Sequence, residues 1–388
     1  MLEREYQKEV IKLLQEAVKI PSINPPGEEK AMGEFVYDYM TKNGIETEKI
    51  MVQKDRFNVL SKIPGKSRKG ILFTGHMDVV PVSEEEKKRW NLDPFGGVII
   101  GNHLYGRGAS DMKSGLCAIM VAMKILKEQN IVPEQDIAFV ATVDEEDAML
   151  GSKAMIGRED LKNYKSCVVA EPTNMILCNR GRGRTYGNLY IKGQTGHGSR
   201  ACPNHNAILL CNKIIDKMNK TTFDKIRTPE KEQSFWQPLA IEAGVEPCVV
   251  PDSCTMKIDA RLVLNHDPED IWIRMKEIID EIQVEIPEIQ VDIEIIDKRE
   301  SWTTSCQSPI MKQLKKVYED LHFIYETKIF TGTTDGTVFR RDGRDIVIIG
   351  PGDLSCVHRE NEKVNLEEVQ RSVELYLRLM KSDISGEK

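Results

Sequence analysis

The chain has 388 residues, a length that usually divides into two domains. Its composition is 40% hydrophobic and 30% charged, and its formal net charge of -7 argues against nucleic acid or an anionic membrane as the main partner. The nine cysteines are scattered without a C-x-x-C pair, which predicts reduced thiols and a cytoplasmic location. The charged, amphipathic N-terminus lacks the apolar core of a signal peptide, and no run is long enough to span a bilayer.

The first half of the chain alternates strand and helix patterns. Apolar runs at 71–75, 137–143 and 167–172 predict buried strands, and 112–129 predicts a helix between the first two. Strands alternating with helices are typical of a mostly parallel sheet with helices on its faces. The first half therefore predicts an α/β domain.

A different order of elements follows the arginine- and glycine-rich stretch 179–187. Strand, helix, strand, strand, helix and strand patterns follow one another, which predicts a ferredoxin-like α+β domain over residues 183–297. The parallel pattern then returns with a helix at 308–321, a strand at 345–350 and a final helix from about Asn365. We therefore expect one discontinuous domain made of residues 1–182 and 298–388, interrupted by an inserted one.

Ionisable side chains follow several of the predicted strands at their carboxyl ends. They are His76 and Asp78, Glu145 and Glu146, Glu171, and His358, and Asp111 precedes the helix at 112–129. Ligands of open parallel sheets bind outside the carboxyl ends of the strands. Carboxylates and imidazoles gathered there are costly unless cations neutralise the carboxylates. Two divalent cations sharing a carboxylate and a water would do so.

Each of these residues has an ordinary alternative when it is considered alone. Glu145 and Glu146 suit a solvated acidic turn, and Asp111 suits a helix cap. His358 suits a surface loop, and the pair His76 and Asp78 suits a surface turn closed by a proline. The joint pattern is much less expected by accident than any single member.

The segments GHMDVVPV, WNLDPFGG, LYGRGASDMKSG, DEE and AEPT, in this order, resemble the co-catalytic metallopeptidase and deacylase family. That family includes acetylornithine deacetylase, succinyl-diaminopimelate desuccinylase, aminoacylase and glutamate carboxypeptidase. The resemblance covers nearly the whole chain. It implies a zinc-peptidase-like catalytic domain with an inserted lid and dimerisation domain, and a homodimer formed through that insert.

The resemblance also implies a role for each residue of the predicted site. His76, Asp111 and Glu171 would bind one metal, and Asp111, Glu146 and His358 the other. Asp78 would orient the His76 ring. The metals are expected to be zinc, with cobalt or manganese as alternatives.

The resemblance also implies that a water molecule bridging the two metals attacks the substrate. Glu145 would act as the general base that takes a proton from this water. His197, in the inserted domain, would donate a hydrogen bond to the oxyanion, in dimeric relatives from the partner subunit.

The expected substrate is an N-acyl amino acid, as in deacetylases and desuccinylases. In the family, glutamate at the position of Glu171 accompanies deacylases and carboxypeptidases, and Arg261 matches a lid arginine suited to a carboxylate. For Arg261 the alternative is an ion pair with Asp259. Gly332, Thr333 and Thr334 resemble a substrate loop, or form an ordinary turn.

Other interpretations of the sequence remain open. A metallo-dipeptidase or carboxypeptidase acting on short peptides is the nearest alternative, and an inert relative is a further one. Arg182 and Arg184 would face an acidic substrate or form a hinge. Many relatives carry asparagine where this chain has Cys248, which weakens an assignment to succinyl-diaminopimelate in particular.

Overall fold

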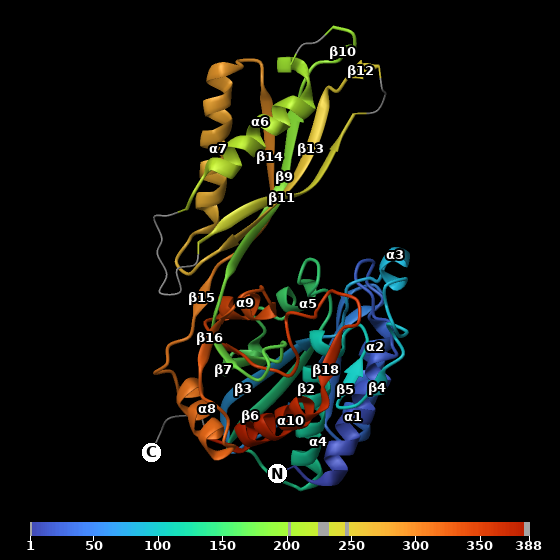
Figure 1. The fold of residues 1–388 in the computed structure, drawn as a ribbon. Helices are drawn as coiled ribbons and strands as arrows, with labels where there is room; N and C mark the ends of the chain where they lie inside the picture. The colour runs from blue at the N-terminus through green and yellow to red at the C-terminus, as the bar shows by residue number, and fades with distance from the viewer. Residues whose placement is uncertain (1, 201–202, 224–232, 245–247, 384–388) are drawn as a thin grey trace. The chain divides into compact units, whose positions relative to one another are not determined.

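The computed structural model describes residues 2–200, 203–223, 233–244 and 248–383 (Figure 1). The chain divides into two compact units. Unit 1 comprises Met1–Arg180, Thr303–Phe330 and Thr334–Lys388, and unit 2 comprises Gly181–Trp302 and Thr331–Thr333. The sequence-based limits of the insert were 183 and 297, against 181 and 302 in this division.

Unit 1 is built on a mixed sheet whose central strands are parallel. The strands, in spatial order, are β1 (Glu46–Gln53), β2 (Arg56–Ile63), β6 (Gln135–Thr142), β3 (Ser67–His76), β7 (Tyr164–Val169), β17 (Asp345–Ile348), β8 (Leu177–Gly181) and β15 (Trp302–Thr303), and β16 (Thr327–Phe330) pairs with β8. β3 runs parallel to β6 and β7, and β7 runs parallel to β17. The carboxyl ends of these four strands therefore meet at one edge of the sheet.

Helices cover both faces of this sheet. The helices of unit 1, within the described residues, are α1 (Arg4–Val18), α2 (Lys30–Lys42), α3 (Glu84–Lys87), α4 (Ser114–Glu128), α5 (Leu150–Lys153), α8 (Pro309–Asp320), α9 (Asp335–Phe339) and α10 (Leu366–Lys381), with short turns η1 (Ala109–Lys113), η2 (Glu159–Leu161) and η4 (Arg340–Asp342). The short helix α3 buries no residue and does not belong to these layers. The helices α1, α4, α8 and α10 pack together (Figure 1). A small sheet of β18 (Lys363–Asn365), β5 (His103–Tyr105) and β4 (Val98–Ile100) lies beside them.

Alternation along the strands explains the two helical layers. Phe73, Val168 and Val347 belong to the large apolar core shared with α1, α4 and α10. Their neighbours Val169 and Ile346 point the other way, and Gly336 of α9 packs directly against both. Strands buried on both faces are expected for a parallel sheet, and the continuous apolar runs of the sequence reflect this.

Unit 2 is an antiparallel sheet with two helices on one face. Its strands are β11 (Phe235–Ala243), β13 (Ser253–Leu262), β9 (Gly183–Lys192) and β14 (Gln290–Arg299), in this spatial order, with helices α6 (Ala207–Lys220) and α7 (Pro268–Glu285), the turn η3 (Pro203–His205), and a separate pair β10 (Gly196–His197) and β12 (Val249–Val250). With the chain order β9-α6-β11-β13-α7-β14, this arrangement is ferredoxin-like. The predicted fold class is confirmed in both units.

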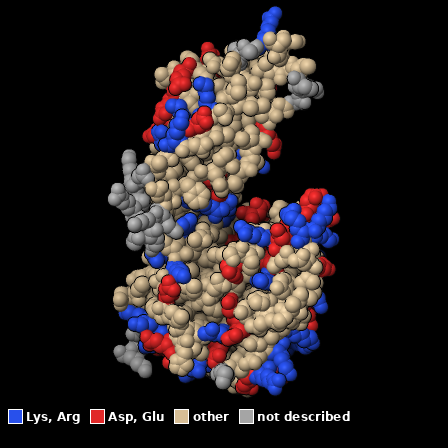
Figure 2. Space-filling model, viewed as in Figure 1, with Lys and Arg blue, Asp and Glu red and all other residues tan. Residues whose placement is uncertain are grey.

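The surface carries charges of both signs, and the described cysteines form no disulfide bonds. In the view of Figure 2, acidic and basic side chains stand next to each other along α7, where Arg274 pairs with Glu277 and Glu281. All cysteines within the described residues are free thiols. Among the described residues, no helix has the length and apolar character that crossing a membrane requires.

Candidate active site

The predicted site residues of unit 1 converge at the carboxyl edge of the sheet. His76 ends β3, Glu145 and Glu146 follow β6, and Glu171 follows β7. His358 lies on the loop after β17. Asp111 lies in the irregular turn just before α4. The parallel order of the strands therefore brings together residues that are almost 300 positions apart in the sequence.

Asp111 lies between the two imidazole rings. Its Oδ1 is 3.1 Å from Nε2 of His76, and its Oδ2 is 3.2 Å from Nε2 of His358. Nε2 of His358 is also 2.9 Å from Oε1 of Glu146, and Nε2 of His76 is 3.9 Å from Oε1 of Glu171. The capping alternative for Asp111 is wrong, because α4 begins without a side-chain cap.

Burial makes the negative charges of this cluster energetically unfavourable. Glu145 and Glu171 are 7% and 4% exposed, so the solvated acidic turn is wrong for Glu145. Burial, together with neighbouring carboxylates, raises the pKa of both groups well above the ordinary value. Burial disfavours protonation of His76, but hydrogen bonds to Asp111 and Asp78 outweigh it and raise its pKa well above the ordinary value. The Oε1 of Glu145 is buried without a hydrogen-bond partner within the described residues.

These groups fit a divalent cation. Two sets of three ligand atoms lie within 4.8 Å of one another, one from His76, Glu145 and Glu171 and the other from His76, Asp111 and Glu146. Imidazole nitrogen and carboxylate oxygen are donors that zinc and related cations accept. A cation would also offset the crowded negative charge of the four carboxylates when the two imidazoles are neutral and free to act as ligands.

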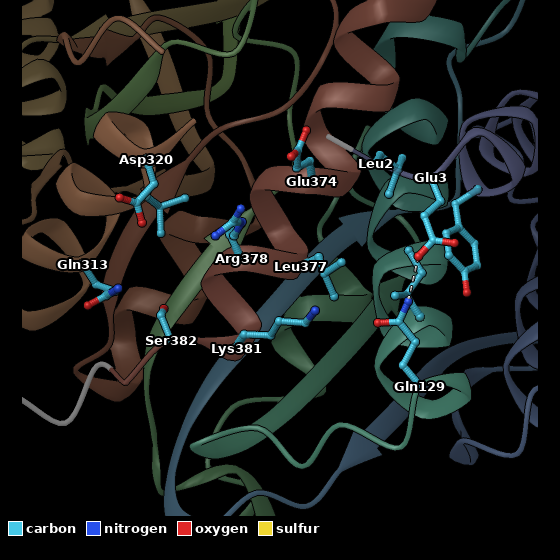
Figure 3. A pocket seen from close by; sticks show the side chains of 13 residues that line it. Leu2, Glu3, Gln129, Gln313, Asp320, Glu374, Leu377, Arg378, Lys381 and Ser382 are labelled. Atoms are coloured by element: carbon cyan, nitrogen blue, oxygen red, sulfur yellow. Dashed lines mark hydrogen bonds between the residues drawn. The ribbon is translucent and has the colours of Figure 1, made fainter. Parts of the chain in front are cut away.

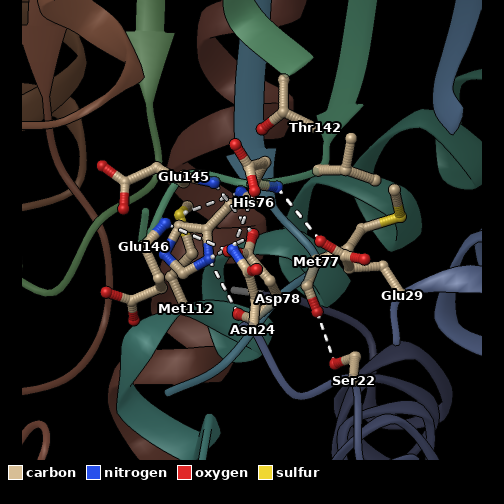
Figure 4. A network of polar contacts seen from close by, with 12 residues as sticks. Ser22, Asn24, Glu29, His76, Met77, Asp78, Met112, Thr142, Glu145 and Glu146 are labelled. Carbon is tan, nitrogen blue, oxygen red and sulfur yellow. Dashed lines mark hydrogen bonds and ion pairs between the residues drawn. The ribbon is translucent and has the colours of Figure 1, made fainter. Parts of the chain in front are cut away.

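Asp78 holds the site together from beneath (Figure 4). It is fully buried, and its main-chain oxygen lies 2.9 Å from Nδ1 of His76, whereas its Oδ1 is 3.5 Å away. Its carboxylate accepts the backbone N–H groups of Glu145, at 3.2 Å, and Glu146, at 3.0 Å. Asp78 therefore orients the ring through its backbone and fixes the acidic loop through its side chain.

The sequence reasoning missed the residues that support Asp78. Nδ2 of Asn24 donates to Oδ2 of Asp78, at 2.9 Å, and to Oδ1 of Asp144, at 3.2 Å. Nη2 of Arg56 donates to the same Asp144 oxygen at 2.7 Å, and Arg56 also pairs with Glu29. Asp144 itself has a left-handed φ of 68°, a conformation that is uncommon outside glycine and that aspartate adopts more readily than most residues. The proline pair after Asn24 was visible in the sequence, but nothing indicated that Asn24 contacts Asp78, 54 residues further along the chain.

A second buried ion pair supports Asp111 from the other side. Oε1 of Glu362 accepts the backbone N–H groups of Ser110, at 3.0 Å, and Asp111, at 3.1 Å. Its Oε2 accepts from Nη1 of Arg107 at 2.7 Å. Arg107 also donates to Glu86 at 2.6 Å. The turn that carries Asp111 is thus fixed by a carboxylate about 250 residues away, for which the sequence carried no signal.

All but one of the remaining predicted site residues lie in unit 2, and the exception is Thr334. His197 is exposed on β10, with Nδ1 2.8 Å from Oγ of Ser199. Arg261 makes the ion pair with Asp259 that was its alternative, at 2.8 Å. Gly332 and Thr333 belong to unit 2, where Oγ1 of Thr333 accepts from Arg299 at 3.2 Å. Thr334 belongs to unit 1, and its buried hydroxyl caps α9 by accepting from Gly336 at 3.1 Å.

A cavity of about 420 Å³ lies elsewhere in unit 1, among α1, α4, α8 and α10 (Figure 3). Its lining includes Leu2, Gln129, Arg378 and Lys381 and none of the site residues. α4 begins beside Asp111 and is about 22 Å long, so its far end at Gln129 lies at the opposite edge of the sheet. The candidate active site is therefore defined by its side chains and not by this cavity.

Comparison with known proteins agrees with this fold. The Peptidase family M20/M25/M40 matches residues 72–382, and the chain belongs to this family. The chain is 27% identical over 379 residues to the succinyl-diaminopimelate desuccinylase of Hydrogenovibrio crunogenus, covering 95% of this chain and 97% of that protein. As a member of this family it is a hydrolase of the metallopeptidase and amidohydrolase class, which acts on C–N bonds.

Solved structures share the fold. The M20 family metallo-carboxypeptidase Sso-CP2 of Sulfolobus solfataricus superimposes with a TM-score of 0.76 at 22% identity, covering 96% of this chain and 98% of that chain. The aminopeptidase PepT of Bacillus cereus gives a TM-score of 0.76 at 21% identity, with 97% and 98% covered. At these identities the likeness concerns the fold alone.

Replacing Asn24 tests the support beneath Asp78. We expect Asn24→Ala to lower the free energy of unfolding by roughly 1–3 kcal/mol, because two buried carboxylates lose a donor. Chemical denaturation measures this effect. The control is Asn188→Ala, which removes a half-buried amide whose Nδ2 donates to the exposed Glu294, and which is expected to change stability by less than about 0.5 kcal/mol. Equal losses in the two variants would contradict the role of Asn24.

In the metal-free protein, we expect the free energy of unfolding to fall as the pH rises. Burial opposes protonation of His358, but Asp111 and Glu146 raise its pKa to about 11. The folded metal-free protein then keeps a proton that the unfolded chain releases near pH ~6.5, so this contribution is complete below that pH and is lost toward the folded value. The raised pKa of Glu171 acts in the same direction from about pH 4.5 upward.

Thermal unfolding of chelator-treated protein between about pH 6.5 and 9 measures this dependence. We expect the midpoint to fall across the range, and to fall less in His358→Asn. A midpoint that stays level or rises in the unsubstituted metal-free protein would be inconsistent with the protonated cluster.

Proposed function

We propose that the protein hydrolyses the amide bond of N-acyl amino acids, in the manner of acetylornithine deacetylase and succinyl-diaminopimelate desuccinylase. The observation that carries the proposal is the cluster of two imidazoles around the buried Asp111, with the buried Glu145 beside it. The presence of glutamate at 171 and the desuccinylase named among its relatives support a deacylase over other members of the family.

The proposed metal ligands are the five residues predicted from the sequence. His76, Asp111 and Glu171 would hold one ion, and Asp111, Glu146 and His358 the other, with zinc first and cobalt or manganese as alternatives. The contacts of Asp111 with both rings support its bridging role. When bound, such ions lower the pKa of a water and polarise the scissile carbonyl.

Glu145 is the proposed general base. Its backbone is fixed by Asp78, its Oε1 lies buried without a partner, and burial raises its pKa well above the ordinary value. A carboxylate in such an environment accepts a proton readily near neutral pH. It takes one from the attacking water and delivers it to the nitrogen of the leaving amine. Geometry alone would also allow Glu145 to bind metal, so the two acidic neighbours need separate tests.

Residues of unit 2 and the loop 332–334 are the proposed substrate contacts. His197 would donate a hydrogen bond to the oxyanion of the tetrahedral intermediate, and its exposed ring is available for this. Arg261 would bind a carboxylate of the substrate. Gly332, Thr333 and Thr334 would offer backbone and hydroxyl groups, and the Thr334 oxygen accepts from Gly336 of α9, so its O–H is the group that would act as a donor.

We further propose a cytoplasmic homodimer formed through unit 2. Apolar side chains are exposed on α6 at Ile208 and Leu209 and on the edge strand β11 at Leu239 and Ile241. In Figure 2 the surface over β11 and β13 is mostly uncharged. An unpaired edge strand with apolar neighbours favours pairing with another chain.

Light scattering after size exclusion tests the dimer. We expect a mass of twice 44.1 kDa for the unsubstituted chain and a monomer for Leu239→Arg. The matched control is Ile324→Arg in unit 1, an apolar side chain that is 87% exposed, which should remain dimeric. A monomeric unsubstituted protein would refute the dimer.

Separate substitutions of Glu145 and Glu146 test the mechanism. We expect Glu145→Gln to keep the metal content of the unsubstituted protein and to lower kcat by about 10²–10⁴-fold, because the base is lost and the ligands are not. Glu146→Ala should lose metal. Elemental analysis beside turnover distinguishes the two variants, and full metal content in both would contradict the assigned roles.

The substrate class is tested with the zinc-loaded protein. Amine release would be followed from N-acetyl and N-succinyl amino acids and from unblocked dipeptides. Turnover of the acylated set, abolished by Glu145→Gln, is the expected result. Turnover of dipeptides alone would favour the alternative, a metallo-dipeptidase or carboxypeptidase on short peptides, which the peptidases among its structural neighbours suggest.

A further inference from the structure

We propose that Arg184 joins Arg261 in a paired site for one carboxylate group of the substrate, on the face of the unit 2 sheet opposite its helices. From the sequence, Arg261 was the arginine expected to bind a substrate carboxylate, whereas Arg184 would face an acidic substrate or form a hinge. The inference rests on the proposed function for its ligand, but its geometry lies entirely within unit 2.

Strand register places three arginines in one row. Arg184 of β9 is directly opposite Arg261 of β13 and directly opposite Arg299 of β14. Their neighbours Ala260 and Leu262 pack in the helix-covered core, so the arginines point to the other face of the sheet. Like charges directly opposite one another destabilise a sheet, so such a row needs a compensating partner.

One buried carboxylate orients two of these guanidinium groups. Asp259 is 1% exposed; its Oδ1 accepts from Nε of Arg184 at 2.5 Å, and its Oδ2 accepts from Nε of Arg261 at 2.8 Å. Within the described residues neither guanidinium makes another hydrogen bond, so the terminal Nη groups of both are left without partners. Their side chains are nevertheless only 23% and 28% exposed.

The charge of the row is not balanced by its own carboxylates. Arg299 pairs with Asp297 at 2.7 Å, and Asp259 serves the other two arginines. Three guanidinium groups and two carboxylates leave one positive charge among these five residues. Burial lowers the pKa of Arg261, and the nearby Arg184 and Arg299 lower it further, while Asp259 opposes this.

A carboxylate matches the donors that remain. The Nη groups of a guanidinium form a planar fork that binds the two oxygens of a carboxylate. Arg184 is also held over the ring of Tyr186, 4.7 Å from its centroid, which limits its motion. Because Asp259 fixes both Nε atoms, the two forks are oriented before a ligand arrives, which reduces the entropy lost on binding. The substrate class is therefore an amide that carries a carboxylate.

Binding of succinate to the metal-free full-length protein tests this site without any turnover. Calorimetric titration with succinate is compared with succinamide, which has the same shape and no charge. We expect saturable binding of succinate only, and a rise in Kd of about tenfold or more in Arg184→Gln, with Arg184→Lys intermediate because it keeps the charge but loses the fork. Arg274→Gln, on the exposed side of α7, is the matched control and should bind as the unsubstituted protein does.

The outcomes separate this inference from the proposed function. Unchanged succinate affinity in Arg184→Gln, or equal binding of succinate and succinamide, would overturn the paired site even if the enzyme hydrolyses N-acyl amino acids. Loss of succinate binding in Arg184→Gln would support the site even if no such substrate is turned over. Thermal unfolding of each variant confirms that it is folded. In the zinc-loaded enzyme, a higher KM for Arg184→Gln with little change in kcat would support the paired site.

Discussion

The site depends on one constraint, which is the crowding of carboxylates at a buried sheet edge. Asp111, Glu145, Glu146 and Glu171 lie around two imidazoles where burial penalises every negative charge. Such a cluster persists only if other groups supply hydrogen bonds and positive charge. Asp78 and Glu362 have their acceptors filled by backbone N–H groups and so hold the loops in place, and the remaining imbalance makes the cluster suitable for cations.

The parts of the fold and site that the sequence could predict are those set by residues close together in the chain. Strand ends and the residues after them are local features, so the convergence of His76, Glu145, Glu171 and His358 followed from the parallel order alone. The supports are not local. Asn24 reaches Asp78, and Glu362 reaches Asp111, through contacts that only the folded chain defines. Those residues carried no signal in the sequence.

Strand register accounts for a second gap in the sequence-based view. The residues RGRGR were compatible with a hinge, because an isolated sequence does not say which residues oppose one another across a sheet. In the structure β9 is a central strand of unit 2, and its register aligns Arg184 with arginines from two other strands. The proposed chemistry is thereby divided, with metal ligands and base in unit 1 and most of the proposed substrate contacts in unit 2.

The N-terminal segment is part of the active-site architecture and not merely its cover. Nζ of the buried Lys113, two residues after Asp111, donates to the main-chain oxygens of Ala17, at 3.1 Å, and Ile20, at 2.6 Å, at and just after the end of α1. Oγ of Ser22 donates to the main chain of Met77 at 2.6 Å. Proteolytic loss of these first residues would therefore loosen at once the two loops that carry the proposed metal ligands His76 and Asp111. A shortened chain that failed to bind zinc would report on this attachment, and its ligands could all be intact.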